Sequence, residues 1–142
     1  MNTKFDFSKL TLQVIDITMN STPDIYINQK SITFSKRLLD DMGYPGYVQY
    51  CIDPEQGVFA VRVCKGNEAK AVAFSKPRNE QMNSTLTLTN KNIHDVIAKF
   101  IPGYTTKKRY KLVGHYDSEN KIMYFDIKEA TVHMYHKEEP ED

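Results

Sequence analysis

Tryptophan is absent from this 142-residue chain, cysteine occurs only twice, and no long apolar run is present. Cys51 and Cys64 are too few for the disulfide framework of a small secreted protein, and they do not form a zinc site by themselves. A membrane-spanning helix needs about 20 apolar residues, and the opening residues MNTKFDF contain no apolar signal region. We therefore expect a soluble cytoplasmic protein with reduced thiols.

The short motifs by which many enzymes are recognised are also missing. The sequence has no nucleophile elbow, no HExxH and no glycine-rich phosphate loop. His133 and His136 are three residues apart, but no third and fourth metal ligand accompanies them. Glu55 and Glu119 fall in expected hairpin loops, where carboxylates are normally solvated. We expect no enzymatic activity, no metal and no cofactor.

The residues that are present are sufficient for one folded domain spanning residues 1–142. Hydrophobic residues make up 40% of the chain, and 9 Tyr and 7 Phe supply large side chains for a core. The formal net charge is only +1. Residues 137–142 form an acidic tail, a solvated end by composition, and the charge of the remaining chain is correspondingly more positive.

The first half of the chain predicts strands around one short helix. Alternating apolar residues predict an added strand over 12–18, and residues 25–34 read as one bent strand or two short ones. Ser35 can cap a helix whose apolar face is Leu38, Leu39 and Met42, and Gly43 and Pro45-Gly46 end it. Two strands, 47–52 and 58–63, then flank a hairpin loop. A further short strand is expected at 71–74.

The same order of elements recurs after a polar linker at 76–83. A strand at 85–89 precedes a helix capped by Asn90 or Asn92, and strands at 109–116 and 122–127 follow. The segments DPEQGVFAVRV and DSENKIMYFDI, which begin at Asp53 and Asp117, align without a gap. This predicts a β-rich α+β fold with two tandem βαββ halves, about 23–75 and 84–130, in one compact core.

Residues 32–63 resemble the AbrB-type swapped-hairpin family of bacterial transition-state regulators and antitoxins. The resemblance rests on the Ile32 to Lys36 helix start, apolar Leu38 and Met42, the Gly43 cap and the Pro45-Gly46 turn, followed by a hairpin. It implies that two copies of the motif interlock, so this chain would be a pseudo-dimeric monomer or a homodimer. It also implies non-enzymatic binding of duplex DNA and a role in transcription regulation.

Basic residues flank the start of the first predicted helix and also occur in the loop that enters the strand at 109–116. They are the candidate DNA contacts, because each cation on a phosphate adds salt-dependent affinity. They are Lys30, Lys36, Arg37, Lys107, Lys108, Arg109 and Lys111. Tyr104 and Tyr110 beside the second group could instead stack the bases of a single strand. Asp40 and Asp41 would repel phosphate, or pair with Arg37 along the helix.

A second function remains open from sequence. The chain could be a protein-interaction or accessory module of a bacterial mobile element that binds no nucleic acid. An exposed sheet edge or a tyrosine-rich surface would then hold a protein partner.

Overall fold

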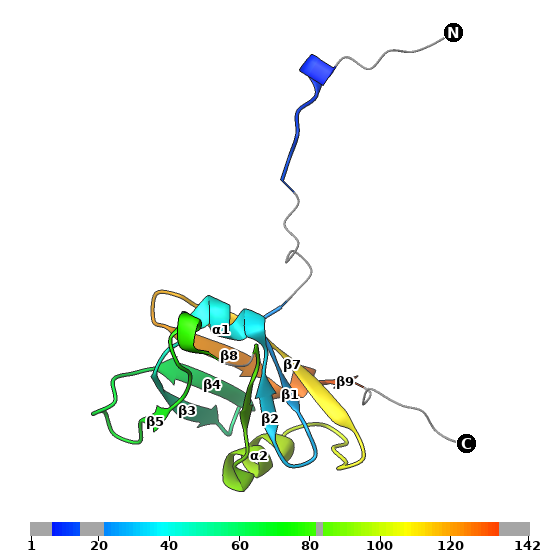
Figure 1. The fold of residues 1–142 in the computed structure, drawn as a ribbon. Coiled ribbons are helices and arrows are strands. Elements are labelled where there is room, and N and C mark those ends of the chain that lie inside the picture. Colours follow the sequence, from blue (N-terminus) through cyan, green and yellow to red (C-terminus); the bar gives the residue numbers. More distant parts are fainter. Residues whose placement is uncertain (1–6, 15–21, 82–83, 134–142) are drawn as a thin grey trace.

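The computed structural model describes residues 7–14, 22–81 and 84–133. Its strands form one curled antiparallel sheet, a half-barrel, in the order β5-β3-β4-β8-β7-β1-β2-β6, and β9 pairs with β7 (Figure 1). Helix α1 (Lys36–Met42) and helix α2 (Lys91–Ala98) lie near opposite ends of the sheet. The protein is therefore β-rich α+β, as the sequence predicts.

The strands occupy most of the ranges that the periodicity indicates. The first four are β1 (Asp24–Ile27), β2 (Ile32–Phe34), β3 (Tyr47–Asp53) and β4 (Val58–Val63). They are followed by β5 (Val72–Ala73), β6 (Leu86–Leu88), β7 (Arg109–Asp117) and β8 (Ile122–Asp126). Three short 3₁₀ turns are η1 (Phe7–Lys9), η2 (Arg78–Glu80), inside the predicted linker, and η3 (Ile127–Glu129). Strand β9 (Thr131–His133) has no counterpart in the sequence prediction.

The predicted strand over residues 12–18 is wrong in its described part. Residues 10–14 belong to no strand, and the side chains of Leu12 and Val14 are 87% and 98% exposed. Figure 1 shows this segment apart from the sheet. The prediction failed because it depended on alternation alone. A strand is stable only when a neighbouring strand pairs with its backbone hydrogen-bonding groups. Residues 15–18 and the acidic tail 137–142 lie outside the described residues.

Helix α1 is held by its two caps and its packing. The Ser35 hydroxyl accepts a hydrogen bond from the Leu38 amide, and Gly43 adopts a left-handed φ of 78°. Seven residues are too few for a stable isolated helix, so α1 depends on burying Leu38, Leu39 and Met42. Each buried side chain of this size contributes about 1.5–3 kcal/mol.

Helix α2 is capped by Asn90, which accepts from the Ile93 amide. It buries His94, Ile97 and Ala98, and Ile93 and Val96 are half-buried. The Nε2–H of His94 donates to the Asn28 carbonyl at 2.7 Å, since a carbonyl can only accept. This bond fastens α2 to the turn between β1 and β2.

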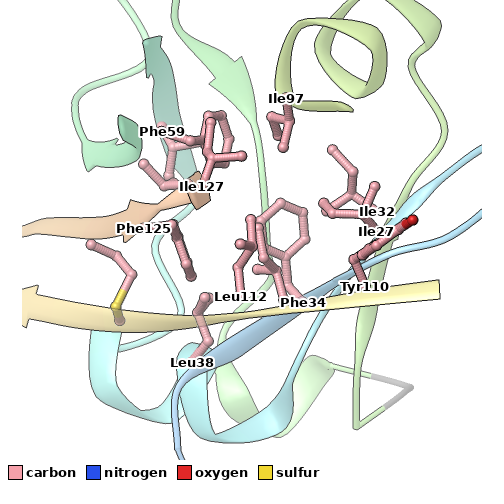
Figure 2. Close-up of a cluster of buried hydrophobic side chains, with 14 of the residues drawn as sticks. Ile27, Ile32, Phe34, Leu38, Phe59, Ile97, Tyr110, Leu112, Phe125 and Ile127 are labelled. Atoms are coloured by element: carbon pink, nitrogen blue, oxygen red, sulfur yellow. The ribbon is translucent and has the colours of Figure 1, made fainter. Parts of the chain in front are cut away.

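The core fills the inside of the half-barrel. Figure 2 shows side chains from strands and both helices pointing toward one another. Its largest fully buried members include Phe34, Phe59, Phe125, Leu38 and Ile97. Phe59 stacks on Phe125 with ring centroids 5.9 Å apart. Side chains from both sides of the linker at 76–83 therefore pack in one cluster.

Strand β7 links the two sides of the half-barrel. Residues 110–113 pair with β1, residues 109–111 pair with β9, and residues 114–117 pair with β8. The Gly114 amide donates to the Pro23 carbonyl at 2.6 Å. A Cβ added at Gly114 would lie 2.6 Å from that oxygen and 2.7 Å from the Met123 sulfur, so only glycine fits this junction.

The two hairpin loops have matching geometry. Asp53 Oδ1 accepts from the amides of Glu55 and Gln56, and Asp117 Oδ1 accepts from those of Glu119 and Asn120. Gly57 and Lys121 have positive φ values of 67° and 59°. Across the β4 and β8 pair, Val63 donates to the Lys121 carbonyl and Ile127 donates to that of Gly57.

Candidate nucleic-acid interface

Four of the predicted cations lie on regular elements: Arg109 and Lys111 on β7, and Lys36 and Arg37 at the start of α1. In an antiparallel sheet alternate side chains leave the core. Ile25 and Ile27 of β1 are buried, so Tyr26 lies on the outer side; on β7, Tyr110 and Leu112 are buried. Arg109 and Lys111 therefore project outward beside Tyr26, about 6.6 Å apart at the usual strand rise.

One polar hollow contains cations from both halves of the chain. It measures about 380 Å³ and is lined by Lys36, Arg37 and Lys111, with Asp24, Tyr26, Thr22 and Ser35. Helix α1 contributes the first two cations and β7 the third. The two basic groups that the sequence separates by about 70 residues thus meet around β1.

Carboxylates neutralise these three cations. Lys36 Nζ lies 2.9 Å from Asp40, and Arg37 Nε lies 3.0 Å from Asp41. The bond from Lys36, opposed by partial burial and aided by the hydroxyl of Tyr44, holds the pKa of Asp40 below its ordinary value. The predicted pairing of Arg37 along the helix is therefore present.

The third cation, Lys111, faces a buried acid. Its Nζ lies 3.5 Å from Asp24, whose side chain is only 8% exposed. The Thr22 hydroxyl donates to the same carboxylate at 3.0 Å. The backbone of Asp24 is also bonded to Ser35 in both directions, which ties β1 to the helix cap. Asp24 was missed from sequence because a buried acid at a strand start resembles an ordinary turn residue.

Arg109 is positioned by neutral groups. Its Nε donates to Asn28 Oδ1 at 2.8 Å, and its guanidinium lies 4.2 Å from the centre of the Tyr26 ring. His133 packs on Tyr26 with ring centroids 4.9 Å apart. Stacking of this kind fixes a cation without neutralising it. Tyr26 and Asn28 were not predicted as site residues, although alternation along residues 25–27 could have placed Tyr26 outside.

Two further predicted cations lie in the loop immediately before β7. Lys107 and Lys108 are exposed and have no ion-pair partner among the described residues. We define the basic face as Lys36, Arg37, Lys107, Lys108, Arg109 and Lys111, with Tyr26 between its two ends. Against Asp24, Asp40 and Asp41 it retains a net charge of +3.

Lys30 lies apart from the hollow on the basic face. It is exposed in the turn between β1 and β2, and it lines another hollow of about 360 Å³ with Lys91, His94 and Asp95. Lys30 therefore lies in the same turn as Asn28, the hydrogen-bond partner of Arg109, and does not line the hollow of Lys36 and Arg37.

The tyrosines beside the second basic group do not offer a stacking platform together. Tyr110 is 3% exposed, and its hydroxyl is bonded to the backbone of Gly103 and Thr105. Tyr104 is half-buried and lies 5.4 Å from Tyr110 by ring centroids. Base stacking on Tyr110 is wrong as an interpretation because its ring belongs to the core.

The remaining polar groups show no assembled chemistry in the described ranges. Within residues 7–14, 22–81 and 84–133, no three His, Cys, Asp or Glu side chains gather at a metal-binding distance. Cys51 and Cys64 are free and half-buried. His133 lies in β9, and His136 is outside the described part of the chain. No described helix is long and apolar enough to cross a lipid bilayer.

Comparison of the chain with protein-family models, with curated proteins and with solved structures finds no match. Interpretation of the basic face therefore depends on its own geometry and charge.

Proposed function

We propose that the protein binds duplex DNA through the basic face and acts as a non-enzymatic regulator of the AbrB-like type. The observation that carries this proposal is the charge of the basic face, where Lys107, Lys108 and Arg109 have no carboxylate partner among the described residues and Lys36, Arg37 and Lys111 share one hollow. A continuous row of cations can contact successive phosphates of a duplex, and such contacts fix register without reading sequence.

Affinity in this proposal comes mainly from cations without a carboxylate partner. Within the described ranges Lys107, Lys108 and Arg109 meet this condition, while the hollow supplies three cations that would have to exchange Asp partners for phosphates. Three full phosphate contacts give a slope of log affinity against log salt of about −2.7. Duplex is favoured over single strand because Tyr110 is buried and offers no base platform.

The test is fluorescence anisotropy with a mixed-sequence duplex across a salt series. Lys107→Glu/Lys108→Glu should abolish most binding. Lys65→Glu/Lys70→Glu, which makes the same charge change in the loop between β4 and β5, should weaken it far less. Absence of binding at low salt, or equal losses in both variants, refutes the proposal.

We also propose that the halves 23–75 and 84–130 form an intramolecular pair of βαββ units. The sequence alignment places Ala60 opposite Tyr124, and these two residues are Cα partners at the middle of the β4 and β8 pairing. Antiparallel pairing centred on equivalent residues is what a two-fold relation between two units produces.

The matched hydrogen bonds support the same relation. The Val63 amide donates to the Lys121 carbonyl. In the alignment Val63 corresponds to Ile127 and Lys121 to Gly57, and the Ile127 amide donates to the Gly57 carbonyl. The test is to produce residues 1–80 and 81–142 separately. We expect each to be unfolded by circular dichroism and the mixture to recover the native spectrum. A half that folds alone as a monomer contradicts the pairing.

A protein-interaction function is the second candidate, and an apolar hollow between β3 and α2 favours it. The hollow measures about 170 Å³ and is lined by Tyr50, Ile52, Phe59, Ile93 and Val96, with Cys51 and Asn92. An apolar side chain of a partner could anchor there. A nuclease-resistant complex lost on Val96→Glu, with duplex binding absent, would favour this function over DNA binding.

A further inference from the structure

The segment at residues 10–14 combines the features of a donor strand. Leu10, Leu12 and Val14 alternate with polar residues, so they would share one side of a strand, and they are 44%, 87% and 98% exposed. The intervening residues are Thr11 and Gln13, so the segment has no charge. We define residues 10–14 as the arm. Exposure of these apolar side chains to water is unfavourable, and the alternation of apolar and polar residues is typical of a half-buried strand.

The edge of β6 has the complementary features of an acceptor. Strand β6 ends the path of the sheet and pairs on one side only, with β2. In the part of the chain that the structure describes, no other backbone hydrogen bond reaches residues 84–89. Leu86 and Leu88 face the core yet remain half-buried, and Thr85, Thr87 and Thr89 are exposed.

This edge lacks charge and proline as protection against strand addition, although β6 itself spans only three residues. Natural edge strands are commonly guarded by charge, proline or shortness. Residues 84–90 contain neither a charged residue nor a proline. At the opposite end of the path, β5 has two residues and is flanked by Lys70 and Lys76. The β6 edge is therefore the better template for an added strand.

We propose that the arm of one copy adds to the β6 edge of a second copy, and that reciprocal exchange of two arms makes a homodimer. The arm would run antiparallel to β6 with Leu10 opposite Leu88 and Leu12 opposite Leu86. This register puts the apolar side chains of both strands on the core side and leaves Thr11, Gln13 and Thr87 in solvent. In this register the five arm residues lie opposite residues 84–88.

A second copy is the chosen occupant because the arm does not contact its own sheet. In the structure it stands away from the half-barrel with Leu12 and Val14 almost fully exposed (Figure 1). Strand addition between chains satisfies the backbone groups of both edges at once, and a two-fold exchange closes the assembly at two copies. The proposal does not depend on DNA binding.

The full-length protein tests this by sedimentation velocity over a concentration series. Leu12→Glu/Val14→Glu should weaken dimerisation at least tenfold, because charges would enter the apolar side of the new strand. Thr11→Glu/Gln13→Glu adds the same charge to the solvent side and should leave the dimer largely intact. Because the arm lies outside the core, all variants should keep the wild-type unfolding temperature at concentrations low enough for the wild type to be monomeric.

Photo-crosslinking locates the acceptor. A photoreactive residue at position 13, in a mixture of ¹⁵N-labelled and unlabelled full-length protein, should join the arm to the tryptic peptide of residues 79–91 of the other isotope. A monomer at every concentration, crosslinks confined to one chain, or equal dimerisation of the two arm variants would each overturn the proposal.

Discussion

Removing the two helix carboxylates should strengthen DNA binding if the basic face contacts phosphate. In the variant Asp40→Asn/Asp41→Asn, Lys36 and Arg37 lose their ion-pair partners, now at 2.9 and 3.0 Å. Two more cations become available, and each full phosphate contact changes the salt slope by about −0.9. The slope should therefore change from about −2.7 to about −4.5.

The size of this effect can be worked out for a practical salt range. Between about 50 and about 200 mM salt, the two added contacts should cost the variant roughly tenfold more affinity than the wild type loses. At the lowest salt the variant should bind more tightly. Its stability should change little, since each helix ion pair contributes about 0.3–0.5 kcal/mol. Relief of two negative charges near the helix C-terminus offsets that loss.

The assay is anisotropy with one duplex across the salt series, with unfolding curves of each variant as a check. Glu55→Gln/Glu68→Gln is the matched control, because it makes the same charge change in the two loops that follow β3 and β4. An unchanged slope in Asp40→Asn/Asp41→Asn, or an equal change in the control, would refute the assignment of Lys36 and Arg37 to the DNA-binding surface.

Three further changes probe the fold. Gly114→Ala should destabilise by about 1–3 kcal/mol through overpacking against the Pro23 carbonyl, measured by urea unfolding, and a neutral result would contradict the close junction. Ser35→Ala should cost about 1 kcal/mol through the lost N-cap, with Ser35→Thr as the conservative comparison. Hydrogen bonds from Asn120 lower the pKa of Asp117. The ionised Asp117 therefore contributes its full stabilisation at pH values above the ordinary pKa of 3.8, and this contribution is lost as pH falls through the lowered pKa. In Asp117→Asn the thermal unfolding midpoint should fall less steeply with decreasing pH over this acidic range.

Local elements were largely predictable because their signals are local. The Ser35 and Asn90 caps, the left-handed Gly43 and the loops at Asp53 and Asp117 each depend on side chains within four residues. Strand partners were harder, because alternation shows that a segment has two faces and does not show what covers either. The unpredicted β9 illustrates the limit, since three residues carry too little periodicity to detect.

The candidate site was predictable in its cations and not in their surroundings. Charge position in the sequence marked Lys36, Arg37 and Lys111, but their meeting depends on the pairing of β1 with β7. The roles of Asp24 and Tyr26 follow from the same long-range pairing. The outward position of the half-buried Arg109 and the burial of its neighbour Tyr110 follow from which face of β7 meets the core.

The junction at β7 also constrains the order in which the protein can be completed during synthesis. Strand β1 pairs with β7, so the pairing of Asp24 with Val113 can form only after β7 has been synthesised. In the same way, β4 can pair with β8 only after β8 has been synthesised. The nascent chain therefore carries β1 and β4 with unfilled edges until most of the protein has left the ribosome. Contacts this distant in sequence slow folding and prolong exposure of apolar strands. A chain that stops before Arg109 would retain α1 and the first hairpin without the strand that joins them.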